Sequence, residues 1–178
     1  MEKNRQGLLH IYCGDGKGKT SAAVGMAVRA AGCGMKVLVI RFLKTENSGE
    51  VEVLRSIPGI TVPPCERTFG FVFRMTEEQK QEAALYYQSR FEAAAKEAVQ
   101  GQYGLLILDE ILASCNYGMV RETSVVEFLQ NRPEKLEVVL TGRNPSETFL
   151  ELADYVSEIC MRRHPYEKGI PARRGIEF

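Results

Sequence analysis

The sequence lacks several features that would point to particular classes of protein. It has no run of about 18 apolar residues, so we expect no membrane span. No long apolar stretch follows the opening MEKNRQG, so we expect no signal peptide either. The 23 basic and 23 acidic residues leave no net charge. This balance argues against a nucleic-acid binder that relies on bulk positive charge, although it leaves a local basic patch open.

Cysteine and histidine are too scattered to suggest the common metal or nucleophile sites. The five cysteines are odd in number and form no CxxC pair, so we interpret them as reduced thiols of a cytoplasmic protein, without a disulfide framework or zinc site. The only histidines are His10 and His164, and no Ser-His-Asp or Cys-His arrangement is recognisable. We expect His10 to be a hydrogen-bonded core residue and His164 to be structural.

The length and composition indicate a single globular domain. A chain of 178 residues can form one domain with a sizeable core but is too short to form two comfortably. Its 44% hydrophobic and 26% charged residues are ordinary for a globular protein. We therefore expect residues 1–178 to form one domain.

Short apolar runs alternate with helical patterns along this chain. Strands are expected at residues 8–12, 36–43, 59–62, 105–110, 136–141 and 155–161. Helices are expected at residues 19–31, from a capping box at 76–79 to about 101, at 125–131, and from the N-P-S-E sequence that opens with a cap at Asn144. This alternation of apolar strands and helices predicts an α/β fold, with a mainly parallel sheet and helices on both faces.

A glycine-rich stretch between the first expected strand and the first expected helix carries the strongest functional signal. YCGDGKGKT at residues 12–20 is close to the pattern G-x-x-x-x-G-K-[ST], but Cys13 stands where the first glycine is expected. The strand and helix around it nevertheless favour a phosphate-binding loop, in which backbone N–H groups and the helix dipole attract an anion. Lys17 is either a second phosphate contact or a solvated side chain. We expect the nucleotide to be held by Gly14, Asp15, Gly16, Lys17, Gly18, Lys19, Thr20 and Ser21.

Two acids follow an apolar strand in ILDE, at residues 107–110. At this position a Walker B acid would meet a metal ion. We expect Thr20, Asp109 and Glu110 to hold Mg²⁺, with Mn²⁺ as an alternative, because Mg²⁺ prefers oxygen ligands. Loop and acids together predict a nucleotide triphosphate and a three-layer, P-loop NTPase-like (RecA-like) fold. The loop alone leaves a kinase, an ATPase and other activities open.

The remaining motifs resemble one family of P-loop proteins. They are RFLK at 41–44, GFVF at 70–73, LDE at 108–110, NRP at 131–133, VVLTGRN at 138–144, LADYVSEI at 152–159, HPYEKG at 164–169 and RGIEF at 174–178. In this order and spacing they resemble the P-loop family of ATP:corrinoid adenosyltransferases over nearly the whole chain. The TGR, LAD and GIEF elements are more specific than a phosphate loop, and the shortened loop is itself similar to the family's form.

The resemblance implies a reaction, its substrates and its partners. The 5′-deoxyadenosyl group of ATP would pass to the Co(I) of a reduced corrinoid, cobalamin or a precursor, with release of triphosphate. We expect the cob(I)yrinic acid a,c-diamide type of this enzyme. Co(I) is already a strong nucleophile and carries no proton, so the reaction requires no general base. The resemblance also suggests a homodimer and a flavoprotein electron donor.

Individual roles follow from the same resemblance. Aromatic residues at the GFVF position displace the lower ligand of Co(II) in the family, and Phe71 and Phe73 match them. A member of the family has Trp at the second position, whereas this chain has no tryptophan, so we expect Phe73 to pack differently. Core packing is the alternative for both. We expect the catalytic residues to be Lys19, Glu110, Phe71 and Phe73.

Three further cations follow strand ends. Arg41 and Lys44 come at the end of the second strand and can reach phosphate or corrinoid carboxamides, with surface charge as the alternative. Arg143 follows the strand that ends at Thr141 and is a candidate nucleotide contact. Two other function classes stay open from the residues alone. One is a P-loop kinase or small ATPase without corrinoid chemistry, and the other is a protein that carries a corrinoid or senses ATP.

Overall fold

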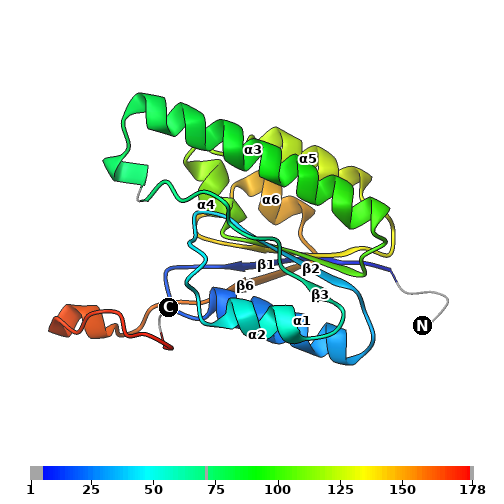
Figure 1. Ribbon diagram of the computed structural model, residues 1–178, viewed down its shortest axis with the longest axis horizontal. Coiled ribbons are helices and arrows are strands. Elements are labelled where there is room, and N and C mark those ends of the chain that lie inside the picture. Colours follow the sequence, from blue (N-terminus) through cyan, green and yellow to red (C-terminus); the bar gives the residue numbers. More distant parts are fainter. Residues whose placement is uncertain (1–5, 71, 177–178) are drawn as a thin grey trace.

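A parallel β-sheet forms the centre of the computed structural model, which describes residues 6–70 and 72–176 (Figure 1). Its strand order is β3-β2-β4-β5-β1-β6, and each neighbouring pair is parallel. The strands are β1 (Leu9–Cys13), β2 (Val37–Arg41), β3 (Ile60–Thr61), β4 (Leu105–Asp109), β5 (Glu137–Thr141) and β6 (Tyr155–Glu158). The predicted parallel sheet is therefore confirmed.

Helices cover both faces of this sheet (Figure 1). On one face lie α1 (Lys19–Gly32) and α2 (Glu50–Ser56). On the other lie α3 (Glu77–Gln100), α4 (Ile111–Asn116), α5 (Glu122–Asn131) and α6 (Glu147–Leu152). Two 3-10 helices, η1 (Val72–Arg74) and η2 (Pro165–Lys168), lie outside these layers. The three-layer α/β class predicted from the sequence is confirmed.

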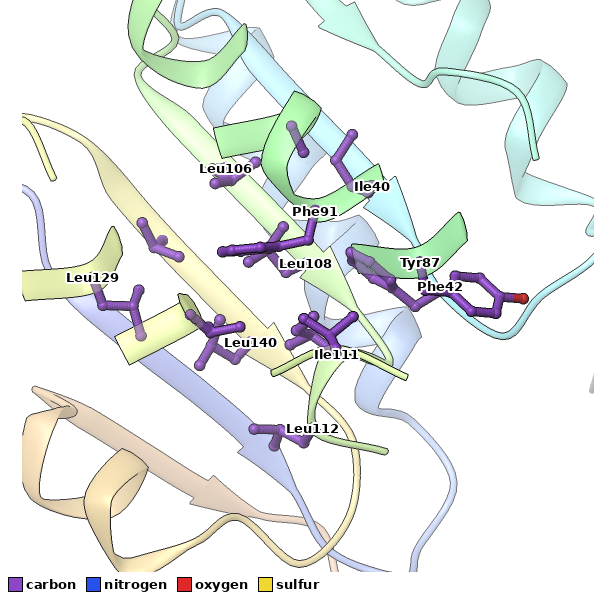
Figure 2. Packing of buried hydrophobic residues seen from close by; sticks show 14 of the residues in the cluster. Ile40, Phe42, Tyr87, Phe91, Leu106, Leu108, Ile111, Leu112, Leu129 and Leu140 are labelled. Carbon is purple, nitrogen blue, oxygen red and sulfur yellow. The ribbon is translucent and has the colours of Figure 1, made fainter. Parts of the chain in front are cut away.

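Two apolar clusters, one on each face, hold the layers together. Successive strand residues alternate between them: Leu106 and Leu108 of β4 face the α3 side (Figure 2), whereas Leu105 and Ile107 face α1. Burying one such side chain contributes about 1.5–3 kcal/mol. Because both faces are covered, β4 is apolar at consecutive positions, and this is why its sequence predicted a buried strand.

Local sequence signals fix the two principal helices. The small residues Ala23, Ala27 and Ala30 form the buried face of α1. The capping box at the start of α3 is present: the Thr76 side chain accepts a hydrogen bond from the Gln79 N–H, and the Gln79 side chain accepts one from the Thr76 N–H. In the part of the chain that the structure describes, no helix combines the length and the apolar character needed to cross a membrane.

Some local predictions were wrong. The helices α2 and α4, with 7 and 6 residues, were not expected, because elements this short show little periodicity. The cap of α6 is Ser146, whose side chain accepts a hydrogen bond from the Phe149 N–H, and not Asn144. Asn144 instead adopts a left-handed turn with φ of 48°. The strand β6 ends at Glu158, so it is shorter than predicted.

The topology brings distant segments to one edge of the sheet. β5 lies between β1 and β4, and all three run in the same direction. The glycine-rich loop after β1, the acids at the end of β4 and the segment after β5 therefore meet at the carboxyl edge. In open parallel sheets this edge is where ligands bind.

Candidate active site

The glycine-rich loop leads from β1 into α1 and packs tightly against the segment after β6. A Cβ on Gly14 would lie 2.5 Å from the carbonyl oxygen of Ile159, and a Cβ on Gly16 would lie 2.7 Å from the same atom. Gly14 also has a φ of 103°, which favours glycine. Cys13, by contrast, is the buried last residue of β1. Position 14 therefore requires a glycine, whereas position 13 is an ordinary strand residue.

Hydrogen bonds hold the loop in a compact form. The Gly16 N–H donates to the Ile159 carbonyl over 2.7 Å. Lys19 Nζ donates to the carbonyls of Gly14 and Gly16, each over 2.8 Å. Burial, with the nearby Arg143 guanidinium as the second cause, lowers the pKa of Lys19. At least one amide of the expected anion nest, that of Gly16, thus already has a partner within the protein. Lys19 would have to release the Gly14 and Gly16 carbonyls in order to bind a phosphate.

A buried carboxylate lies across from the loop. Asp109 ends β4 with 2% exposure, and its Oδ1 accepts hydrogen bonds from Thr141 Oγ1 at 2.7 Å and from Thr20 Oγ1 at 3.1 Å. Its Oδ2 forms an ion pair with Lys44. Thr141 is the residue of this group that the sequence analysis missed as a site residue. The signal that could have identified it is a hydroxyl at the end of an apolar strand.

Glu110 follows Asp109 in an unusual backbone conformation. Its φ is 65°, in the left-handed region, and its N–H donates to Thr141 Oγ1 over 2.8 Å. Burial and the neighbouring Asp109 charge raise the pKa of Glu110, while Lys44 and Lys19 act in the opposite direction. Left-handed residues other than glycine are concentrated at functional sites, where the surrounding structure holds them.

The two cations at the carboxyl end of β2 have different surroundings. Lys44 Nζ donates to Thr20 Oγ1 over 2.8 Å and pairs with Asp109, so Lys44 lies inside the site. Arg41 is 1% exposed and donates to the Thr45 carbonyl and to Glu46, each over 2.8 Å. The alternative of a surface charge is therefore wrong for Arg41, because its side chain is buried and paired within the loop after β2.

A cleft opens beside this group. Its volume is about 730 Å³, within the usual range for ligand pockets. Polar and charged walls come from Lys44, Glu110 and Arg143, while Phe73 and Tyr117 are exposed aromatic residues on its lining. Phe73 is 78% exposed and so does not lie in the core. Phe71 lies outside the residues that the structure describes.

Asp15, Lys17 and Ser21, which were also predicted to hold the nucleotide, are exposed. Asp15 Oδ1 accepts a hydrogen bond from the Met161 N–H over 2.8 Å, and this bond lowers the pKa of Asp15. Arg143 Nη2 donates to the Asp15 carbonyl over 3.4 Å, which ties the segment after β5 to the loop. Lys17 in the loop and Ser21 in the first turn of α1 are both exposed.

Both histidines are in structural positions, as expected. His10 Nε2 lies 2.6 Å from Glu137 Oε1, and its ring stacks on Tyr155 with 4.6 Å between centroids. His164 Nδ1 accepts a hydrogen bond from the Tyr166 N–H over 3.2 Å. All five cysteines are free thiols.

The donor set limits which metal the site can hold. Among residues 6–70 and 72–176, no three His, Cys, Asp or Glu side chains come together as a metal-binding group. Thr20 and Asp109 instead offer a few oxygen donors next to Lys44, and Glu110, which follows Asp109, lines the cleft. Such a set suits Mg²⁺, which usually takes one or two carboxylates and completes its shell with phosphate and water.

Together the sheet order, the loop before α1 and the acid that ends β4 define a P-loop NTPase-like protein. Comparison with known proteins narrows this class. The model of the family described as ATP:corrinoid adenosyltransferase BtuR/CobO/CobP matches residues 5–178. The chain belongs to this family, as its motifs predicted.

Curated relatives extend over the same length. The chain is 32% identical over 177 residues to a corrinoid adenosyltransferase of Pseudomonas aeruginosa, covering 99% of this chain and 86% of the relative. It is also 32% identical to one from Escherichia coli strain K12, covering 99% and 88%. Corrinoid adenosyltransferase CobA of Salmonella typhimurium is 29% identical, with the same coverage. A solved structure of EssC ATPases 2 and 3 from Geobacillus thermodenitrificans aligns with a TM-score of 0.45 and 11% identity over 96% of this chain and 36% of that one, and is too distant to carry an argument.

Proposed function

We propose that this protein transfers the 5′-deoxyadenosyl group of ATP to the Co(I) of a reduced corrinoid and releases triphosphate. Family membership supports ATP-dependent adenosylation of a corrinoid. The observation that carries the proposal is that Lys44, which pairs with Asp109, and Arg143, which contacts the loop at Asp15, both line a cleft of about 730 Å³ that also has aromatic residues on its lining. Phosphate-binding groups and a surface for a large flat substrate are thus adjacent.

In this proposal the phosphate-binding residues stabilise the leaving group. Lys19, released from the Gly14 and Gly16 carbonyls, supplies a positive charge to the departing triphosphate. Arg143 approaches from the segment after β5. Holding the 5′-carbon of ATP in line with cobalt is then the main remaining task of the protein. No residue is needed to remove a proton, because Co(I) carries none.

We expect Mg²⁺, replaceable by Mn²⁺, to be held by Thr20 and Asp109 with Glu110 at the margin. The fit is supported by Lys44, whose ammonium already places a positive charge against Thr20 and Asp109. When bound, the metal neutralises charge on the triphosphate. Thr141 and Glu110 would keep the Asp109 carboxylate oriented through the shared hydroxyl.

The aromatic residues are proposed to prepare the cobalt for reduction. Phe71 and Phe73 would displace the lower ligand of Co(II), which makes reduction to Co(I) easier. The exposure of Phe73 on the cleft supports this role, because a residue packed in the core would not be available to a substrate. Phenylalanine at this position gives a smaller ring than the tryptophan of the family member mentioned above.

Several finer properties also belong to the proposal. We expect a single domain of residues 1–178, the cob(I)yrinic acid a,c-diamide type of activity, a homodimer, a cytoplasmic location and a flavoprotein electron donor. The unpaired cysteines agree with a reducing compartment. Rates with cobalamin and with cob(I)yrinic acid a,c-diamide, measured side by side, would test the substrate type.

The reaction itself can be tested with ATP, Mg²⁺ and chemically reduced cobalamin. We expect the absorption spectrum of an alkylated corrinoid to develop in step with the release of triphosphate. ATP turnover that needs no corrinoid would indicate a kinase or ATPase instead. Tight corrinoid binding without turnover after complete reduction would indicate a carrier.

A further inference from the structure

Lys44 occupies the position in which a metal ion would contact the site. Its Nζ lies 2.8 Å from Thr20 Oγ1 and pairs with Asp109 Oδ2, while Thr20 Oγ1 and Asp109 Oδ1 are 3.1 Å apart. A bound Mg²⁺ lies only about 2.0–2.1 Å from its oxygen ligands. An ammonium and a divalent metal ion in contact with the same oxygens would lie only about 4 Å apart and repel each other strongly, so we expect one to leave when the other binds.

The backbone holds Lys44 in this position. The Phe42 N–H donates to the Asp109 carbonyl over 2.9 Å and so extends the pairing of β2 with β4. Leu43 then turns the chain with a φ of 53°, in the left-handed region. A leucine rarely adopts this conformation unless its surroundings impose it. The turn places Lys44 next to the end of β4 and at the wall of the cleft.

Lys44 supplies the positive charge that the buried Asp109 carboxylate requires. The Asp109 side chain is 2% exposed, whereas that of Lys44 is 22% exposed. A carboxylate buried to this extent is strongly destabilised without a positive partner. The Lys44 side chain reaches Asp109 from the cleft, so its ammonium has a route back to the cleft once another cation has taken its place.

We propose that Lys44 is a placeholder cation, which neutralises Asp109 in the nucleotide-free protein and is displaced when the divalent metal arrives with the triphosphate. The released ammonium then binds the triphosphate in the cleft. This inference rests on the proposed metal site of the adenosyltransferase. The exchange would keep the buried Asp109 carboxylate paired with a cation both before and after the nucleotide binds. It would also make the metal bind tightly only when triphosphate is present to receive the Lys44 ammonium.

The experiment measures Mn²⁺ binding by the electron paramagnetic resonance signal of the free ion. In Lys44→Met we expect nucleotide-free protein to bind Mn²⁺ at least about tenfold more tightly than wild type, because its competitor is gone. The preformed complex of Mn²⁺ and inorganic triphosphate should bind about tenfold more weakly, because the triphosphate loses a cationic partner. Changes in opposite directions are not expected from a lysine that only supports the fold.

Lys80→Met is the matched control, since Lys80 lines the same cleft but pairs with Glu77 over 2.7 Å. Its nucleotide-free affinity for Mn²⁺ should equal that of wild type. Lys44→Gln provides a second neutral variant, and circular dichroism checks that each variant is folded. If folded Lys44 variants bind Mn²⁺ without nucleotide no more tightly than wild type, the placeholder role is refuted. Failure of the wild type to bind the Mn²⁺–triphosphate complex would instead refute the proposed metal site and the inference with it.

Discussion

Replacement of Thr141 by valine removes one hydroxyl at a fully buried position and nearly preserves the shape of the side chain. That hydroxyl donates to Asp109 Oδ1 over 2.7 Å and accepts the Glu110 N–H over 2.8 Å. A hydrogen bond to a charged group contributes about 1.5–3 kcal/mol, and an unsatisfied buried N–H costs about 1–3 kcal/mol. Because both bonds depend on one hydroxyl and their energies are not fully additive, we expect the free energy of unfolding to fall by about 2–4 kcal/mol.

Urea unfolding followed by far-UV circular dichroism measures this loss. With an m-value of about 2 kcal/mol/M, the midpoint should fall by about 1–2 M while m stays unchanged. Thr141→Ser is the matched variant, because it keeps the hydroxyl and should lose only about 0.8 kcal/mol for the missing methyl group. Thr148→Val on the exposed face of α6 should stay within about 0.5 kcal/mol of wild type. Equal stability of Thr141→Val and Thr141→Ser would refute the reasoning.

Four other predictions concern the cleft, the loop, the helix α1 and the thiols. Phe73→Ala should leave the free energy of unfolding nearly unchanged, since the ring is 78% exposed. It should reduce activity that starts from Co(II) and spare activity when Co(I) is supplied. Equal loss in both assays would rule out a role in reduction. Gly14→Ala should lower the free energy of unfolding by about 2 kcal/mol or more, because of a φ of 103° and a backbone contact at 2.5 Å. Gly25→Ala, in the open interior of α1, should instead raise it by about 0.5–1 kcal/mol. Burial raises the pKa of Cys115 to about 12, so at pH 8 iodoacetamide should modify the exposed Cys33 well before Cys115. Mass spectrometry measures the order of modification, and the reverse order would contradict the burial of Cys115.

The sheet was predictable because its strands are buried on both faces. The run LLIL in β4 has no polar position, and a stretch of this kind between turn signals is typical of a parallel strand. The start of α3 was also predictable, since both halves of its capping box are local in sequence. The short helices α2 and α4 have too few residues for a periodic pattern, so only tertiary packing distinguishes them from loops.

The site was predictable where its signal is local. The loop and the acids were found from their own motifs and from the elements that flank them. The displaced glycine could not be explained in this way, because its cause is the approach of Gly14 to Ile159, far along the chain. That explanation requires knowing that the segment after β6 packs against the loop.

Residues that act through distant partners were missed or left open. Thr141 lies 32 positions from Asp109, and Lys44 lies 65 positions from it. Only the order of the strands brings them together, so no local pattern shows that Lys44 pairs with Asp109 whereas Arg41 pairs with Glu46. The sequence does not show with which cation a nearby glutamate will pair.

The most direct test of the proposed function follows the transferred carbon. ATP labelled with ¹³C at the 5′-carbon, incubated with the protein, Mg²⁺ and chemically reduced cobalamin, should yield a corrinoid whose ¹³C signal is that of a carbon bonded to cobalt. The ³¹P spectrum of the same sample should show inorganic triphosphate. Formation of ADP or diphosphate in place of triphosphate, with the labelled carbon still bonded to oxygen, would contradict the proposed adenosyl transfer.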